Sequence, residues 1–169
     1  MRLRSPKKIV DEMQILKINF GINLFHFTDS VVNRPENHFK DLCQELINRK
    51  LNVTWTGFFR EDSLTPQNLA LAMKAGLTAI YFSGDALTDQ GLKLLNKNLN
   101  CDHIIDAAKL TAQTGILTMC HFLVNLPGES WQSIMESSEM LNRLLEIHGP
   151  AKNLGAVIFN HIRLYPKAP

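Results

Sequence analysis

Five apolar segments of the sequence each end in polar side chains whose types could bind a ligand. The polar ends are Thr28-Asp29, Arg60, Ser83-Gly84-Asp85, Asn125, and Arg163 with Tyr165. Carboxylate, guanidinium, amide and hydroxyl groups fix a polar ligand through hydrogen bonds and ion pairs. If the five segments are strands of one sheet, a single ligand could contact several of these side chains.

The segment 121–130, which reads HFLVNLPGES, carries the sharpest of these polar ends. Asn125 precedes a turn in which Gly128 lets the backbone approach a ligand closely, and the helix that begins after Ser130 offers free N–H groups. The structural alternative is a tight Pro-Gly turn that only joins a strand to a helix, with Ser130 as the N-cap.

The other polar ends also have structural alternatives, which the sequence alone leaves open. Asp29 and Asp62 could be turn residues, and Arg60 could pair with Glu61 or with a helix carboxylate. The histidines at positions 26, 121 and 161 could be satisfied core side chains.

The three cysteines do not predict a metal site. Cys43, Cys101 and Cys120 lie far apart and form no C-x-x-C or C-x-x-x-C spacing. Each falls in a periodic apolar segment or at a helix start, which favours small buried or capping side chains over metal or redox chemistry. We therefore predict no metal ligands in this chain and a reducing compartment.

Strand-like and helix-like patterns alternate along the chain, and these elements must position the polar ends. Glycines 21, 76 and 115 each close a helical pattern. We predict strands over 22–29, 52–60, 77–84, 116–127 and 154–165. We predict five helices, over 5–20, around 39–47, over 65–76, from about 104 to 115 and over 130–149, with a further short helical piece around 92–95.

Some details of these helices follow from the spacing of their apolar residues. Ser5 is the predicted N-cap of the first helix, which carries an apolar stripe of Ile9, Met13, Leu16 and Phe20. The last helix should turn four side chains inward, namely Ile134, Leu141, Leu144 and Leu145.

The alternation of strands and helices predicts an α/β fold with a parallel sheet. The 169 residues, of which 45% are hydrophobic and 20% charged, fit one domain over 1–169. In parallel α/β architectures, ligands gather at the carboxyl ends of the strands. The polar ends described above occupy those positions.

Six segments, in the same order, resemble the barrel of the radical S-adenosylmethionine (SAM) superfamily. The similarity is greatest to the group whose members often carry an N-terminal cobalamin-binding domain. The matching segments are RLRSPKKIVDEM, FHFTDS, WTGFFREDSL, YFSGDALTDQGLKLLNKN, NLPGES and RLYPKAP. The resemblance implies a partial TIM-type (β/α) barrel of parallel strands two to six, which lacks the first strand.

The sequence departs from the family pattern at three places. The C-x-x-x-C-x-x-C loop that holds a [4Fe–4S] cluster is absent, so we expect it upstream of this chain. The family's Glu-Ser-Gly-Ser reads Asp85-Ala86-Leu87-Thr88 here, and Asn125 replaces a glycine.

The resemblance also implies roles for individual residues. Asp85 and Thr88 would face the ribose of SAM, and Asn125 and Leu126 would flank its adenine. Further candidates for the cofactor are Arg60 and Arg163, and candidates for the substrate are His121, Tyr165 and Asp29.

The expected function is that of part of a radical SAM enzyme, which positions SAM and substrate for 5′-deoxyadenosyl radical chemistry. The cofactors are then SAM, a [4Fe–4S] cluster in the complete protein only, and possibly cobalamin held by a separate domain. The alternative is a non-catalytic α/β module that has lost the cluster. A cofactor-independent barrel enzyme such as an aldolase has less support, because no strand-borne lysine or close carboxylate pair is present.

The composition limits which classes of partner we expect for this protein. With 18 Lys and Arg against 16 Asp and Glu, the net charge of +2 does not indicate a nucleic-acid surface. No apolar run has the roughly 20 residues of a membrane span, so we expect a cytoplasmic protein. The substrate, a small molecule or a peptide, cannot be identified. The strand over 22–29 presents an edge through which the chain could self-associate.

Overall fold

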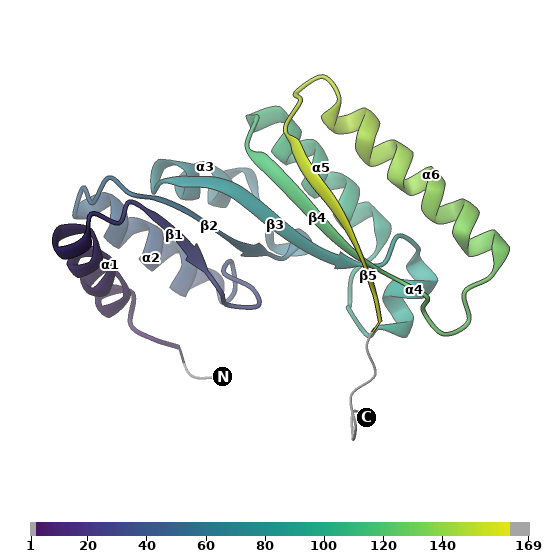
Figure 1. The fold of residues 1–169 in the computed structure, drawn as a ribbon, viewed down its shortest axis with the longest axis horizontal. Coiled ribbons are helices and arrows are strands. Elements are labelled where there is room, and N and C mark those ends of the chain that lie inside the picture. Colours follow the sequence, from purple (N-terminus) through teal and green to yellow (C-terminus); the bar gives the residue numbers. More distant parts are fainter. Residues whose placement is uncertain (1–2, 163–169) are drawn as a thin grey trace. The chain divides into compact units, whose positions relative to one another are not determined.

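The computed structural model describes residues 3–162 of the chain, so Arg163 and Tyr165 lie outside the described residues. Helices and strands alternate along the chain (Figure 1). Their order is α1 (Pro6–Phe20), β1 (Leu24–Phe27), α2 (Glu36–Asn48), β2 (Thr54–Phe59), α3 (Pro66–Lys74), β3 (Leu77–Asp85), α4 (Asp89–Leu94), α5 (Cys101–Thr114), β4 (Leu117–Val124), α6 (Trp131–His148) and β5 (Leu154–His161). The strands follow one another in chain order in the sheet, and β1 with β2 and β4 with β5 run parallel.

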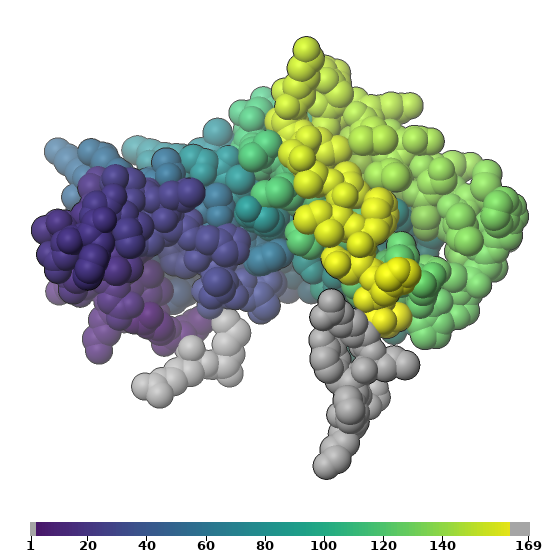
Figure 2. Space-filling view, in the orientation of Figure 1, coloured from purple at the N-terminus to yellow at the C-terminus, as the bar shows by residue number. Residues whose placement is uncertain are grey.

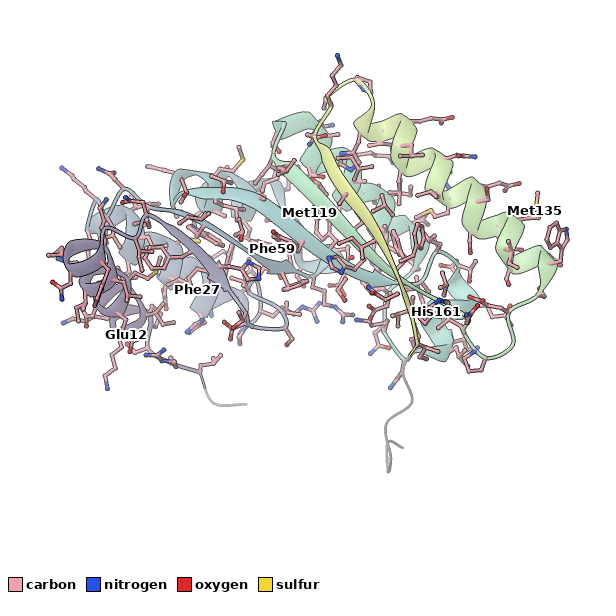
Figure 3. All side chains as sticks on the ribbon, viewed as in Figure 1. Glu12, Phe27, Phe59, Met119, Met135 and His161 are labelled. Carbon is pink, nitrogen blue, oxygen red and sulfur yellow. The ribbon has the colours of Figure 1, made fainter. Side chains whose placement is uncertain are left out.

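The first compact unit covers residues 1–81 and has an aromatic core. Helices α2 and α3 lie on one face of β1 and β2 (Figure 1). On that face Trp55 stacks on Phe59 with ring centroids 6.2 Å apart, and Phe39 of α2 meets Phe59 edge-on at 5.7 Å. Phe27, labelled with Phe59 in Figure 3, also packs edge-on against Trp55. The alternating burial along β2 shows that its other face is more open.

The second compact unit covers residues 82–169 and packs α5 and α6 beside β4 and β5. Its core contains Leu92, Ile105, Phe122 and Leu144, each 2% exposed or less. Along β4 the buried residues alternate with half-buried ones, as expected for a strand with one covered face. Strand β5, yellow in Figure 2, lies open on the surface of this unit.

Most predicted helices and strands are confirmed, but the number of helices and the buried face of α6 differ from the prediction. The piece expected around 92–95 is a helix, α4, so residues 3–162 hold six α-helices rather than five. The inward face predicted for α6 is partly wrong, because Ile134 and Leu145 are 49% and 47% exposed. The buried positions are Met140, Leu144 and His148, each about one helical turn after the one before. Ser5 is the N-cap of α1, but its side chain makes no capping hydrogen bond.

None of the helices within residues 3–162 is both long enough and apolar enough to span a bilayer.

Candidate functional site

Asp85 is the last residue of β3, and its carboxylate is held on both oxygens. The Ser83 hydroxyl donates a hydrogen bond to Oδ1 at 2.9 Å. Lys97 forms an ion pair with Oδ2. Asp85 adopts φ of +65°, a left-handed conformation that a non-glycine residue rarely adopts and that Asp and Asn tolerate best. The strand end thus presents a fixed carboxylate, as expected for a site residue at a carboxyl end.

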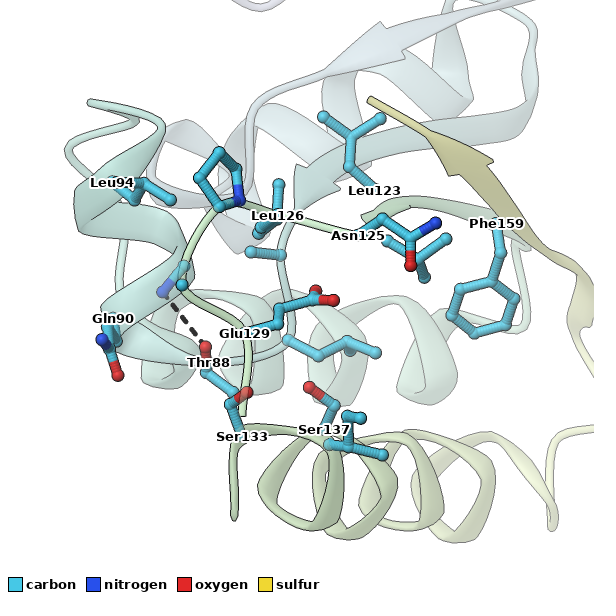
Figure 4. Close-up of a pocket in the computed structure, with 17 residues that line it drawn as sticks. Thr88, Gln90, Leu94, Leu123, Asn125, Leu126, Glu129, Ser133, Ser137 and Phe159 are labelled. Carbon is cyan, nitrogen blue, oxygen red and sulfur yellow. Dashed lines mark hydrogen bonds between the residues drawn. The ribbon is translucent and has the colours of Figure 1, made fainter. Parts of the chain in front are cut away.

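Thr88 has a structural role that the sequence analysis did not assign to it. Its hydroxyl oxygen accepts a hydrogen bond from the Gly91 N–H at 3.1 Å and so caps α4, as the dashed line in Figure 4 marks. A Cβ at Gly91 would lie 2.8 Å from the Ala86 side chain and 3.1 Å from that of Leu126. Gly91 therefore allows α4 to pack closely against the loop that follows β4.

A pocket in the second unit lies between the ends of β3 and β4 and has a volume of about 260 Å³ (Figure 4). Predicted site residues Thr88, Asn125 and Leu126 all line it. This volume is just below the range of about 300 to 1,000 Å³ for pockets that hold whole ligands, so it suits a ring system or another part of a larger molecule. Asp85 directly precedes the lining residues Ala86 and Leu87.

The pocket also contains polar side chains that the site prediction omitted. Glu129 and Ser137 point toward the same hollow as the predicted Asn125 in Figure 4. Glu129 belongs to the turn that the sequence singled out, whereas Ser137 lies within α6 and carried no sequence signal. The position of Ser137 depends on how α6 packs, which no local motif encodes.

Asn125 combines an unusual backbone with a side-chain partner. Its φ is +61°, and its Nδ2 donates a hydrogen bond to Nδ1 of His161 on β5 at 2.7 Å. The residue that replaces a glycine of the family pattern thus keeps a left-handed conformation, and its side chain ties the end of β4 to β5.

Of the predicted ligand residues in the first unit, Arg60 is engaged by a neighbouring carboxylate. Its Nε donates to both oxygens of Asp62, at 3.0 and 3.2 Å, and Arg34 reaches the same carboxylate at 2.7 Å. Burial raises the pKa of Asp62, but the hydrogen bonds and charges of Arg60, Ser63 and Arg34 together lower it below its ordinary value. Asp62 is therefore a partner of Arg60.

Asp29 and His121, both predicted substrate residues, lie in different surroundings. Asp29 is exposed and lines a pocket of about 460 Å³ in the first unit, together with His26 and His38. The sequence analysis did not assign His38. His121 is half-buried in β4, and burial lowers the pKa of its imidazole.

The cysteines do not fit an iron–sulfur cluster. Cys43 and Cys120 are buried and Cys101 is half-buried, and all three are free thiols. Burial raises the pKa of Cys43 to about 12. The pKa of Cys101 rises to about 12 through burial and then through Asp89, whose carboxylate lies beside it. Within residues 3–162, no three His, Cys, Asp or Glu side chains are placed to hold a metal ion.

Comparisons with known proteins agree with this geometry. The family model of the radical SAM superfamily matches residues 1–141. The anaerobic magnesium-protoporphyrin IX monomethyl ester cyclase of Rubrivivax gelatinosus is 30% identical over 145 residues, which cover 82% of this chain and 25% of that protein. The chain thus spans about a quarter of the length of this curated relative.

Two solved structures share the fold. The radical SAM methyltransferase TsrM from Kitasatospora setae, with cobalamin and a [4Fe–4S] cluster bound, matches with a TM-score of 0.78 at 21% identity, over 94% of this chain and 29% of that one. Coproporphyrinogen III oxidase from Escherichia coli matches with a TM-score of 0.67 at 13% identity, over 94% and 38%. The fold is therefore α/β and matches part of a TIM-type barrel, and the chain belongs to the radical SAM superfamily.

Proposed function

We propose that this chain is the part of a radical SAM enzyme barrel that positions SAM and substrate. The observation that carries the proposal is the Asp85 carboxylate, which is fixed at the carboxyl end of β3 beside a pocket lined by Thr88, Asn125 and Leu126. A carboxylate accepts hydrogen bonds from vicinal hydroxyls, and an apolar pocket with a few polar groups suits a heteroaromatic ring. These are the two halves of an adenosine moiety.

The residues of the chain then bind and orient. When SAM is bound at a reduced cluster, it supplies a 5′-deoxyadenosyl radical that abstracts hydrogen from the substrate. Asp85 would hold the ribose hydroxyls, and Leu126, which is 7% exposed, would provide an apolar wall for the adenine. Asn125 would supply polar contacts at the rim of the pocket. Holding the cofactor in one orientation fixes where it can react.

The cluster itself is proposed to bind a cysteine loop upstream of this chain, because Cys43, Cys101 and Cys120 do not fit it. Cobalamin held by a separate domain remains part of the proposal, and its support is the likeness to TsrM, which was solved with cobalamin. The relatives act on different compounds, so the substrate is proposed only as a small molecule or a peptide. The proposal places the protein in the cytoplasm. A non-catalytic module has no comparable support among the relatives.

The test is the affinity of the cluster-containing protein for SAM after substitution of Asp85. Loss of a charge-assisted hydrogen bond worth about 1.5 to 3 kcal/mol should weaken binding roughly ten- to a hundredfold in Asp85→Ala. Asp85→Asn is the cleaner variant, because Asn tolerates φ of +65° whereas Ala is strained there. Calorimetry measures both.

Asp106→Asn is the matched control. This residue lies on α5, is exposed and pairs only with Lys109 among the described residues. Its replacement removes the same charge from the same unit and should leave SAM affinity unchanged. If Asp85→Asn binds SAM as tightly as the unaltered protein does, then Asp85 is only a turn-forming residue and the proposed site is wrong.

A further inference from the structure

Lys97 reaches Asp85 because the chain turns back on itself after α4. Thr88 caps the helix, and the Lys97 N–H donates a hydrogen bond to the Leu92 carbonyl oxygen at 3.1 Å. Asn96 and Asn98, on either side of Lys97, both have positive φ, at +53° and +50°. Two left-handed residues around one lysine fix the course of the backbone there. The backbone therefore holds Lys97 at a position from which its ammonium group pairs with Asp85.

The Lys97–Asp85 ion pair is partly shielded from water. The side chain of Lys97 is 27% exposed and that of Asp85 is 20% exposed. Ion pairs of this kind are screened less than surface pairs, such as that between Lys109 and Asp106, whose side chains are 56% and 74% exposed. This contact can therefore hold the carboxylate in a fixed orientation.

The pair leaves the carboxylate able to bind a further ligand. An ionised carboxylate has about four lone-pair sites. The Ser83 hydroxyl occupies a site on Oδ1 and the Lys97 ammonium occupies one on Oδ2. One site on each oxygen is left, which matches the two hydroxyls of a vicinal diol.

We infer that Lys97 is a positioning residue of the SAM site. It holds the Asp85 carboxylate in one orientation, with the second lone pair of each oxygen available to the two ribose hydroxyls. The inference rests on the proposed function and adds to it a residue twelve positions beyond the strand end. Lys97 acts through Asp85, so its contribution to binding exists only while the carboxylate is present.

A double-mutant cycle tests the inference, because it separates an effect that passes through Asp85 from a direct contact with the ligand. The variants are Lys97→Met, Asp85→Asn and the two combined, in the protein with its cluster segment. The probe is S-adenosylhomocysteine, which carries the same ribose as SAM and can be titrated into cluster-free protein. Lys97→Met should raise its Kd about tenfold, or about 1.4 kcal/mol, in the unaltered background. In the Asp85→Asn background the same substitution should change Kd less than twofold.

Lys93→Met is the matched control. Lys93 lies on α4, four residues before Lys97, and its exposed side chain makes no hydrogen bond or ion pair with the described part of the chain. The substitution Lys93→Met removes an equal charge close to Lys97 and should change Kd less than twofold. Lys97→Arg should keep most of the affinity, because the guanidinium can also donate to Oδ2.

Two results would overturn the inference. An unchanged Kd in Lys97→Met would mean that Asp85 needs no partner, whereas an equal loss in both backgrounds would mean that Lys97 touches the ligand directly. Either result would leave the Asp85 test of the proposed function standing. If Lys97→Met does not fold, as judged by circular dichroism, the same cycle is run with Lys97→Gln, which keeps most of the side chain and loses the charge.

Discussion

At the scale of single residues, the thiols set the limit on cofactor binding by this chain. Cys43, Cys101 and Cys120 lie far apart in the sequence, no three metal ligands lie together within residues 3–162, and burial raises the pKa of Cys43 and Cys101 to about 12, which disfavours the thiolate that binds iron. We therefore expect that residues 1–169, reconstituted anaerobically with iron and sulfide, form no [4Fe–4S] cluster. Iron analysis and the visible absorption spectrum measure this. Four irons per chain with a cluster absorption band would contradict the expectation.

Some residues of the candidate site could be predicted from the sequence, and others could not. Asp85 and Asn125 were predicted as site candidates because each stands at the end of an apolar segment, whereas Leu126 was predicted only from the resemblance to the family. Lys97 and Ser137 were missed, since neither stands at a strand end and each reaches the site through the path of a helix. The pairing of Arg60 with Asp62 was not among the alternatives that the sequence offered, because it depends on the course of the chain after β2.

At the scale of secondary-structure elements, one buried polar network joins helices α5 and α6 to the starts of β4 and β5. Asn153, just before β5, donates from Nδ2 to the carbonyl oxygens of Thr111 on α5, at 2.9 Å, and of Ile116, just before β4, at 2.7 Å. Its Oδ1 accepts from Nδ1 of His148, the last residue of α6, at 2.8 Å. Asn153 and His148 are 4% and 1% exposed. The network fixes the ends of both helices against the start of β4.

Removing Asn153 should therefore destabilise the fold strongly. Asn153→Ala leaves the buried imidazole N–H of His148 without its partner, and an unsatisfied buried group costs about 1 to 3 kcal/mol. The two carbonyl oxygens each lose one hydrogen bond but keep one from the hydroxyl of Thr114 or Thr118. We expect the free energy of unfolding to fall by about 2 kcal/mol or more, measured by urea denaturation. Asn160→Ala is the control, because Asn160 is exposed on β5 and its replacement should change stability by less than about 0.5 kcal/mol. Equal effects of the two substitutions would show that the network contributes nothing.

Helix faces show how far element-level prediction reaches. The buried side of α2 is readable from the sequence, because its apolar residues form one narrow stripe that includes Phe39, Leu42, Cys43 and Leu46. In α6 apolar residues occur all round the helix, so the spacing does not select one side. The packing of α6 against α5 makes that selection, and it buries Met140 and Leu144.

At the scale of the whole molecule, apolar surface is concentrated at one end of the first unit. Strand β1 comes first in the strand order and pairs with β2. The end of α1 and the start of β1 carry a run of exposed apolar side chains, namely Ile15, Ile18, Phe20, Ile22 and Leu24, which are 38% to 71% exposed. Exposed apolar groups next to a strand edge promote association with another chain. The sequence predicted the edge, but the extent of this surface became evident only from the packing of α1.

The chain over residues 1–169 should therefore self-associate in solution, through the edge of β1 and the apolar residues beside it. Burial of one such side chain contributes about 1.5 to 3 kcal/mol, which is large compared with a net stability of roughly 5 to 15 kcal/mol. Sedimentation at increasing protein concentration measures the association.

The substitution Leu24→Lys should shift the chain toward monomer, because Leu24 is 64% exposed and a charge on an edge strand opposes pairing. Trp131→Lys is the control, since Trp131 is 77% exposed but begins α6 in the second unit. A monomer at every concentration would mean that this edge needs no partner.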